Sequence, residues 1–185
     1  MAVEDPRHKA SDTKADDPTD SEGYSPPCYL REANAAYAGY LTGPELIDIL
    51  NELLEGERAG ARATIQFVGE SQEPQLQTLM RKVSIDEARC CAMLAGHIRA
   101  LGGMPSAETG AFYRRLVAIS DVRDRLAFLN RGQGWVVRKL QDVLRGVGDV
   151  RLYDDLKAML RDHEANIRRC NRYLEATKPD AAPAS

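Results

Sequence analysis

The sequence has few of the features that mark several common classes of protein. Only four of its 185 residues are cysteines, too few for a disulfide-stabilised scaffold, and 6% are aromatic. No apolar run approaches the roughly 18 residues that a membrane-spanning helix needs. The N-terminus is charged from residue 4 onward and lacks the apolar segment of a secretory signal. We therefore expect a cytoplasmic protein with reduced thiols and no membrane partner.

An excess of charge of one sign is lacking as well. The chain carries 25 basic and 28 acidic side chains, a formal charge of −3, without the concentrated basic face of a nucleic-acid binder. It contains no glycine-rich phosphate loop, nucleophile elbow or Cys-x-x-Cys zinc pattern. The 43% of apolar residues suit one domain with a sizeable core. We expect no nucleic-acid partner.

The distribution of apolar residues divides the chain into four parts. Residues 1–25 are rich in acidic side chains and hold almost nothing apolar, which predicts a disordered acidic tail. Residues 26–42 contain tyrosines and leucines, and we expect them to form an ordered arm against the domain. The domain itself occupies residues 43–177, and residues 178–185 are expected to be a frayed tail.

Within the domain, apolar residues recur every three or four positions, and no alternation typical of a strand appears. Residues 107–119 suggest a short connecting helix, which leaves a five-helix count open, and Ser120 is expected to cap the helix that follows. The pattern predicts four long helices, at about residues 44–70, 74–101, 121–146 and 150–176. Helices about 40 Å long indicate an all-α fold, an antiparallel four-helix bundle of the up-and-down kind.

The inward stripe of each predicted helix is apolar except near its midpoint. The polar midpoint residues are Glu57, Glu87, Gln133 and His163, one in each helix. Because antiparallel helices of similar length bring their centres to one level, these side chains should converge in one layer. Unpaired buried carboxylates each cost several kcal/mol, so a divalent metal ion is the simplest neutralising partner. Cys90 lies one turn beyond Glu87 on the same face and is a further candidate ligand.

This arrangement resembles the ferritin-like superfamily. Its di-iron or di-manganese sites take one Glu from each of two helices and a Glu-x-x-His pair from each of the other two. Glu57 matches the lone Glu of the first helix, Glu87 matches the Glu of the second, and His163 matches the His of the fourth. The resemblance implies a ferritin-like bundle with metal ligands at these positions.

The sequence departs from the ferritin-like pattern at three positions. Cys90 stands where the second helix has its His, and Leu160 where the fourth has its Glu. The third helix offers Gln133 or Asn130 in place of a Glu. These departures favour a single metal ion over a di-metal centre. The segment 128–135 and the pair His163-Glu164 also resemble a bacterial branch of this superfamily with no known activity, matched over about residues 25–175.

Two functions from different classes remain open. In the first, Glu57, Glu87 and His163 hold one iron or manganese ion, and an open coordination position permits oxidative chemistry. Cys90 or Gln133 completes the shell, and a thiolate at Cys90 would shift the preference towards zinc. In the second, the bundle has lost its metals and is an interaction or structural module, which is compatible with a homo-oligomer.

Several of these residues also have plainer interpretations. The two central glutamates would form ion pairs with nearby arginines if no metal binds, and the candidates are Arg58, Arg62, Arg89 and Arg131. Cys90 is equally typical of a small buried apolar residue. His97 lies about 15 Å along the helix axis from Glu87, so we expect it to be structural.

Overall fold

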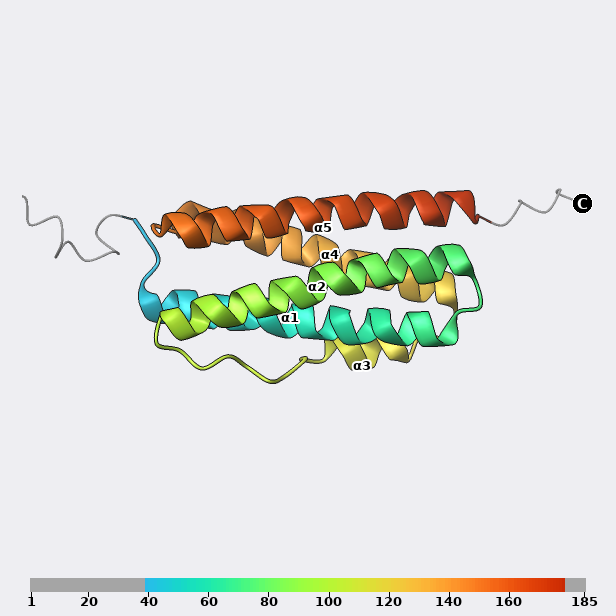
Figure 1. Cartoon of the computed structure of the whole chain (residues 1–185), viewed down its shortest axis with the longest axis horizontal. Helices are drawn as coiled ribbons and strands as arrows, with labels where there is room; N and C mark the ends of the chain where they lie inside the picture. Colours follow the sequence, from blue (N-terminus) through green and yellow to red (C-terminus); the bar gives the residue numbers. More distant parts are fainter. Residues whose placement is uncertain (1–38, 179–185) are drawn as a thin grey trace, which may run out of the picture. The chain divides into compact units, whose positions relative to one another are not determined.

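The structure, a computed structural model, describes residues 39–178, which form helices and no strand within that range. The four long helices are α1 (Gly43–Glu70), α2 (Pro74–Ala100), α4 (Val122–Val143) and α5 (Val150–Ala176) (Figure 1). Helix α3 (Phe112–Val117) is short, and a 3₁₀ turn, Leu144–Gly146, follows α4. The predicted all-α fold, with a short helix before the third long one, is confirmed.

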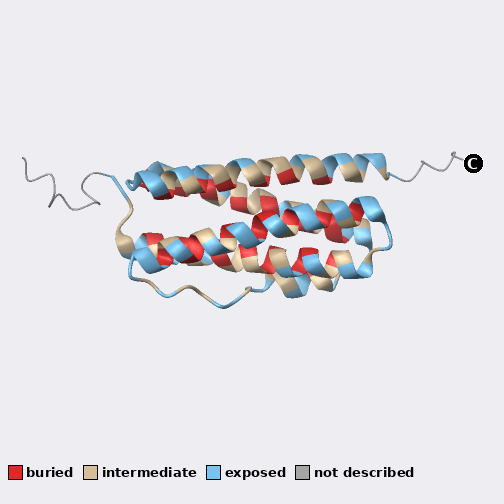
Figure 2. Ribbon diagram, in the orientation of Figure 1, coloured by how far each residue is buried: buried red, intermediate tan, exposed pale blue. Residues whose placement is uncertain are grey.

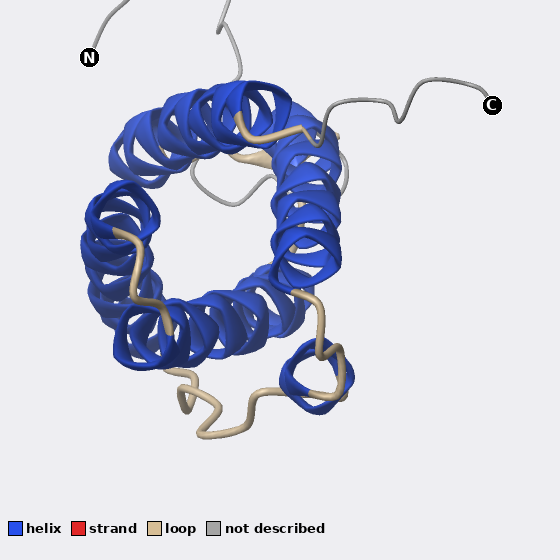
Figure 3. Cartoon of the chain, turned by 90° about the vertical axis from the view of Figure 1, so that its right-hand side faces the viewer, coloured by secondary structure: helices blue, strands red, loops and turns tan. Residues whose placement is uncertain are grey.

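The four long helices form a ring in which each helix is antiparallel to both of its neighbours (Figure 3). Helix α1 packs mainly on α2, and α4 packs mainly on α5, so the bundle consists of two helical hairpins. The hairpins join through smaller contacts of α2 with α5 and of α1 with α4. Helix α3 lies outside the ring, against α1 and α4.

The chain order differs from the predicted up-and-down order. Helices α2 and α4 are consecutive long helices, yet they run in the same direction and are not neighbours in the ring. Residues 101–121 return along the bundle, through α3, before α4 begins (Figure 1). A single long crossover of this kind is characteristic of ferritin-like bundles. The neighbouring helices are still antiparallel, so their midpoints share one level.

The core consists of two apolar clusters, one towards each end of the bundle. Buried positions follow the inward faces of the long helices (Figure 2). The first cluster includes Leu50 of α1, Leu94 of α2 and Leu140 of α4. The second includes Phe67 of α1 and Leu126 of α4. Each long helix contributes to both clusters, and the polar midpoint residues lie between them.

The inward face of α5 is rotated relative to the prediction. The apolar spacing of the sequence predicts that Tyr153, Leu160 and Ile167 share the inward stripe of His163, but the three are only half-buried. The same spacing predicts inward positions for Leu101 and Val122 at helix ends, and both are exposed. The buried positions of α5 are Leu152, Leu156, Met159, His163, Asn166 and Cys170. Both sets of positions have helical spacing. The spacing of apolar residues alone therefore does not determine which of the two sets faces the neighbouring helices.

Asp121 rather than Ser120 is the N-cap of α4. Its side chain accepts a hydrogen bond from the backbone N–H of Asp124 at 2.8 Å. Asp149 caps α5 in the same way, accepting from the N–H of Leu152 at 2.7 Å. Helix α4 therefore begins one residue later than predicted, because the aspartate carboxylate satisfies one of the free N–H groups of the first turn.

Asp121→Ala is expected to lower the free energy of unfolding by about 1 kcal/mol, because the N–H of Asp124 loses its acceptor. Ser120→Ala is the matched control, and its effect should stay within about 0.5 kcal/mol. Urea denaturation of both variants measures the difference. Equal losses in the two variants would contradict the assignment of the cap.

Parts of the predicted domain organisation lie outside the described residues. These are the acidic tail 1–25, residues 26–38 of the arm and residues 179–185. At the end of the arm, the N–H of Leu41 donates to the carbonyl of Gly146 at 2.8 Å, and Leu41 packs against the first apolar cluster. Within residues 39–178, no helix combines the length and apolar character needed to cross a bilayer.

Candidate metal centre

A layer of polar side chains crosses the bundle between the two apolar clusters. Helices α1, α2, α4 and α5 contribute one midpoint residue each, and the four side chains are only 0–4% exposed. They are Glu57, Glu87, Gln133 and His163. The layer is interior because each residue occupies the inward position between the two apolar halves of its helix.

Three atoms able to bind a metal meet in this layer. A carboxylate oxygen of Glu57, the Sγ of Cys90 and a ring nitrogen of His163 all lie within 4.8 Å of one another. Helices α1, α2 and α5 supply them, and we call these three residues the Glu–Cys–His group. The Nε2 of His163 lies 3.0 Å from Oε1 of Glu57. The chain thus brings together donors that are distant in sequence and chemically different.

The hydrogen bonding of His163 turns its Nε2 towards Glu57. The Nδ1 lies 3.0 Å from the carbonyl oxygen of Met159, and since a carbonyl only accepts, Nδ1 carries a proton. In a neutral ring, Nε2 then faces Glu57 with a lone pair. Neither carboxylate oxygen of Glu57 nor Nε2 of His163 has a hydrogen-bond partner, although all three are buried. Two facing acceptors in a buried layer require a proton or a cation between them.

The electrostatics of the layer also favour added positive charge. Burial opposes the charged form of His163, but the adjacent Glu57 carboxylate outweighs it, and the pKa of His163 is raised. Burial and then the charge of Glu57 raise the pKa of Glu87 well above its usual value. Burial and the charges of both glutamates raise the pKa of the Cys90 thiol. Each of these shifts is the response expected of a group in a buried site with excess negative charge.

The expected arginine partners of the central glutamates are absent from residues 39–178. Arg89, one of the candidates, instead pairs with Asp162 at 2.6 Å and with Asp86 at 3.3 Å. No arginine in this range forms an ion pair with Glu57 or Glu87. The arginine interpretation therefore finds no support in this part of the chain: Arg62, Arg89 and Arg131 are exposed, and Arg58 is half-buried without an ion pair to either glutamate.

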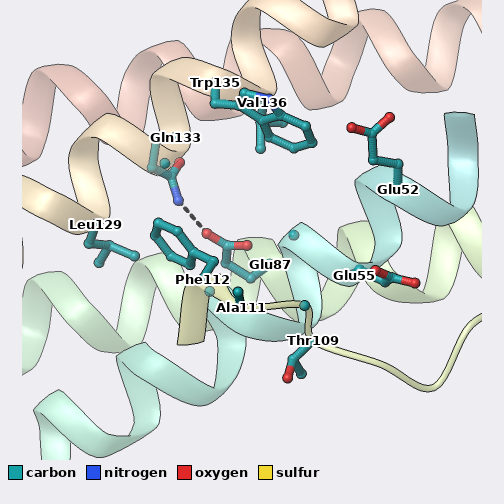
Figure 4. A pocket seen from close by; sticks show the side chains of 14 residues that line it. Glu52, Glu55, Glu87, Thr109, Ala111, Phe112, Leu129, Gln133, Trp135 and Val136 are labelled. Carbon is teal, nitrogen blue, oxygen red and sulfur yellow. Dashed lines mark hydrogen bonds between the residues drawn. The ribbon is translucent and has the colours of Figure 1, made fainter. Parts of the chain in front are cut away.

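The five predicted ligands form the Glu–Cys–His group and an adjoining Glu87–Gln133 pair, in which Glu87 lies next to Glu57. The Nε2 of Gln133 donates to Oε1 of Glu87 (Figure 4). Gly60 of α1 makes room for this pair, because a Cβ there would lie 2.6 Å from Oε2 of Glu87. Gln133 therefore holds Glu87 in place through this hydrogen bond.

Sequence reasoning missed two buried polar residues beside the layer, Asp86 and Asn166. Asp86 is 2% exposed and Asn166 is 1% exposed. The Nδ2 of Asn166 donates to Oδ2 of Asp86 at 3.3 Å, and Lys82 reaches the same carboxylate at 2.6 Å. These contacts tie α5 to α2. Asn166 follows His163 by three residues, and this helical spacing could have predicted that Asn166 faces the same layer. No such spacing marks Asp86, because it is the immediate neighbour of Glu87.

Three solved structures have the same fold at low sequence identity. A ferritin-like diiron-carboxylate protein from Bacillus anthracis str. Ames is 21% identical, with a TM-score of 0.64 over 71% of this chain and 96% of that chain. The dodecameric thioferritin of Bacteroides fragilis, a bacterioferritin-related protein, is 18% identical, with a TM-score of 0.64 over 75% and 89%. An Anabaena variabilis protein with DJ-1/ThiJ/PfpI-like and ferritin-like domains is 16% identical, with a TM-score of 0.62 over 81% and 42%.

These likenesses show the fold, and the predicted resemblance to the ferritin-like superfamily is confirmed. A comparison with curated protein sequences gives no match. The profile of a family described as a domain of unknown function, DUF6306, matches residues 44–172, which run from the start of α1 into the last turns of α5. The chain therefore belongs to the DUF6306 family and is a ferritin-like bundle.

Proposed function

We propose that the bundle binds one divalent transition-metal ion through Glu57, Cys90 and His163. The observation that carries the proposal is the meeting of three donor atoms from three helices, with the Glu57 and His163 donors lacking hydrogen-bond partners. Ligand atoms of a tetrahedral zinc-like ion lie about 3.5 Å apart. The three donor atoms lie within 4.8 Å of one another, so small side-chain movements would bring them to this spacing. Three protein ligands leave one position open, as in catalytic sites.

The donor set favours iron or zinc over manganese. Thiolate and imidazole ligands suit zinc and iron, whereas manganese prefers oxygen ligands. From the sequence we predict iron or manganese, with zinc less favoured. Cys90 belongs to the group and Glu87 does not, which moves the preference towards the softer ions. An ion with an open position supplies Lewis-acid chemistry or, in the case of iron, redox chemistry.

A specific observation also supports the alternative, a metal-free structural bundle. A protonated His163 would form a buried ion pair with Glu57 at the 3.0 Å separation that the structure has. The raised pKa of His163, in which the Glu57 charge outweighs burial, fits this pair. The buried polar residues would then fix the register of the four helices, and the protein would act as an interaction or structural module.

Cobalt(II) distinguishes the two, because a thiolate bound to this ion gives a strong near-ultraviolet charge-transfer band. We expect the metal-free chain to bind one equivalent of cobalt with this band. Cys90→Ser should abolish the band and weaken binding by about 10- to 100-fold, since one of three ligands is lost. Absorbance titration of both proteins measures this.

Cys170→Ser is the matched control for Cys90→Ser. Cys170 is also a buried cysteine, but it belongs to the second apolar cluster, away from the Glu–Cys–His group. Its variant should keep the full band. A wild type without the band at saturating cobalt, or a Cys90→Ser variant that retains it, would contradict the proposed centre.

The expected location and assembly belong to the same proposal. A metal-binding thiol has to stay reduced, which fits the cytoplasm, and the cysteines among residues 39–178 are free. The Bacteroides fragilis relative in fold is a dodecamer. We propose a homo-oligomer for this chain as well.

A further inference from the structure

A pocket of about 290 Å³ lies beside the polar layer, between α1 and α4 and next to the segment that leads into α3 (Figure 4). Glu87 and Gln133 line it, whereas Glu57, Cys90 and His163 do not. The pocket is therefore separate from the Glu–Cys–His group. Glu87 connects the two sites, because it lines the pocket and is also close enough to Glu57 for their charges to interact.

The walls of the pocket are aromatic and aliphatic. Trp135 and Val136 of α4 lie on one side and Phe112 of α3 on another, with Leu129 on the far side of Phe112 (Figure 4). Flat apolar walls of this kind favour a ring over a branched or extended molecule, because aromatic rings stack with offset faces or edges.

Glycines keep the space between these walls open. A Cβ at Gly56 would lie 3.4 Å from Cζ3 of Trp135. At Gly132 the Phe112 ring packs directly on the backbone of α4, where a Cβ would lie 2.5 Å from its Cζ. Any side chain at Gly56 would therefore enter the volume beside the indole. An apolar cavity of about 150 Å³ is enough to hold benzene. The pocket here has room for a ring with one or two small substituents.

A buried acceptor without a partner stands at the inner end. Gln133 is 4% exposed, and its Nε2 donates to Glu87, but its Oε1 has no hydrogen-bond partner. A buried amide oxygen left unpaired is costly, so this site calls for a donor. Because this oxygen has no accessible surface of its own, a hydroxyl or amino group on the occupant would satisfy it after a rotation of the Gln133 amide.

The charges around the pocket disfavour an anion. Glu52 and Glu55 of α1 line its outer part, and Glu87 lies inside (Figure 4). Lys139 neutralises Glu52 at 2.5 Å, while Glu55 accepts a hydrogen bond from Ser106 at 2.6 Å. With the carboxyl groups in excess over the cations, a carboxylate or phosphate would be repelled.

We infer that this pocket binds a small uncharged aromatic molecule that carries one hydrogen-bond donor, such as a phenol. The inference goes beyond the proposed metal centre and does not depend on it, since no residue of the Glu–Cys–His group lines the pocket. An occupant would lie against Glu87, within one side chain of that group.

The single tryptophan of the sequence, Trp135, reports occupancy directly. We expect p-cresol to change its fluorescence saturably, and toluene, which has the same ring without the hydroxyl, to do so as well. Gln133→Leu should weaken p-cresol binding about tenfold, the contribution of one hydrogen bond to a buried acceptor, and leave toluene binding within about twofold. The anion p-toluate should bind at least about tenfold more weakly than p-cresol.

Two variants serve as controls. Gln141→Leu, at an exposed position of the same helix, should bind p-cresol as the wild type does. Gly56→Val should abolish saturable binding of both ligands while keeping a cooperative melting transition, because its side chain fills the space beside Trp135. No saturable change in the wild type, equal losses of p-cresol and toluene in Gln133→Leu, or p-toluate binding as tight as that of p-cresol would each overturn the inference.

Discussion

Chelation of the metal-loaded protein is expected to lower its melting temperature by about 10 °C. A ligand that binds only the native state, at a thousandfold excess over its Kd, stabilises it by about 4 kcal/mol. For a chain of this length, each kcal/mol corresponds to about 2–4 °C. Removal of the ion also leaves Glu57 and Glu87 buried side by side without a metal to balance them. Calorimetry of loaded and chelated samples measures the shift.

Variants of the centre sharpen this test. Glu57→Gln should blunt the response to chelator, because a neutral amide binds the ion more weakly than a carboxylate. Cys170→Ser should respond fully, since this cysteine lies outside the Glu–Cys–His group. A wild type whose melting temperature is indifferent to chelator, after loading with iron, manganese and zinc in turn, would decide for the metal-free bundle.

In the metal-free protein, His163→Leu is expected to lower the free energy of unfolding by about 3–5 kcal/mol. His163 is the only charged partner of Glu57 within residues 39–178, and the two side chains are 2% and 0% exposed. Removing one member strands a buried charge. The double variant Glu57→Leu with His163→Leu should recover most of the loss, because apolar side chains then fill the same layer. Urea denaturation in the presence of chelator gives the double-mutant cycle.

His97→Leu is the matched control for His163→Leu. His97 lies outside the polar layer and pairs with Asp155 at 2.7 Å, and the Asp155 side chain is 42% exposed. Exposed pairs contribute about 0–1 kcal/mol, so this substitution should be mild. If His163→Leu were no more destabilising than His97→Leu, or if the double variant recovered nothing, Glu57 and His163 would not depend on each other as the geometry indicates.

Local properties of the sequence were sufficient to predict the helices. The spacing of apolar residues placed α1, α2 and α5 within one residue of their observed ends. Such boundaries depend on nearby prolines, glycines and capping side chains, which are visible in the sequence. The cap of α4 was misplaced by one residue because serine and aspartate are both good N-caps, and geometry selects between neighbours.

The midpoint residues were also visible in the sequence, as interruptions of four apolar stripes. Burial of Glu57, Glu87, Gln133 and His163 followed from helical periodicity together with antiparallel packing. The sequence did not predict which of these four side chains contact one another. Periodicity fixes the level of a side chain along the bundle, but not the direction in which its polar atoms turn.

Helix lengths, apolar faces and the level of the polar layer can be read from the sequence, since these depend on residues close together in the chain. The tertiary structure alone decided the crossover between α2 and α4, the rotation of α5 and the pairing of Glu87 with Gln133 beside the Glu–Cys–His group. It also decided that a pocket remains between α1 and α4. These features depend on how helices distant in sequence rotate and approach one another. Side-chain volumes set that packing: Gly60 admits the Glu87 carboxyl group, and Gly132 admits the Phe112 ring.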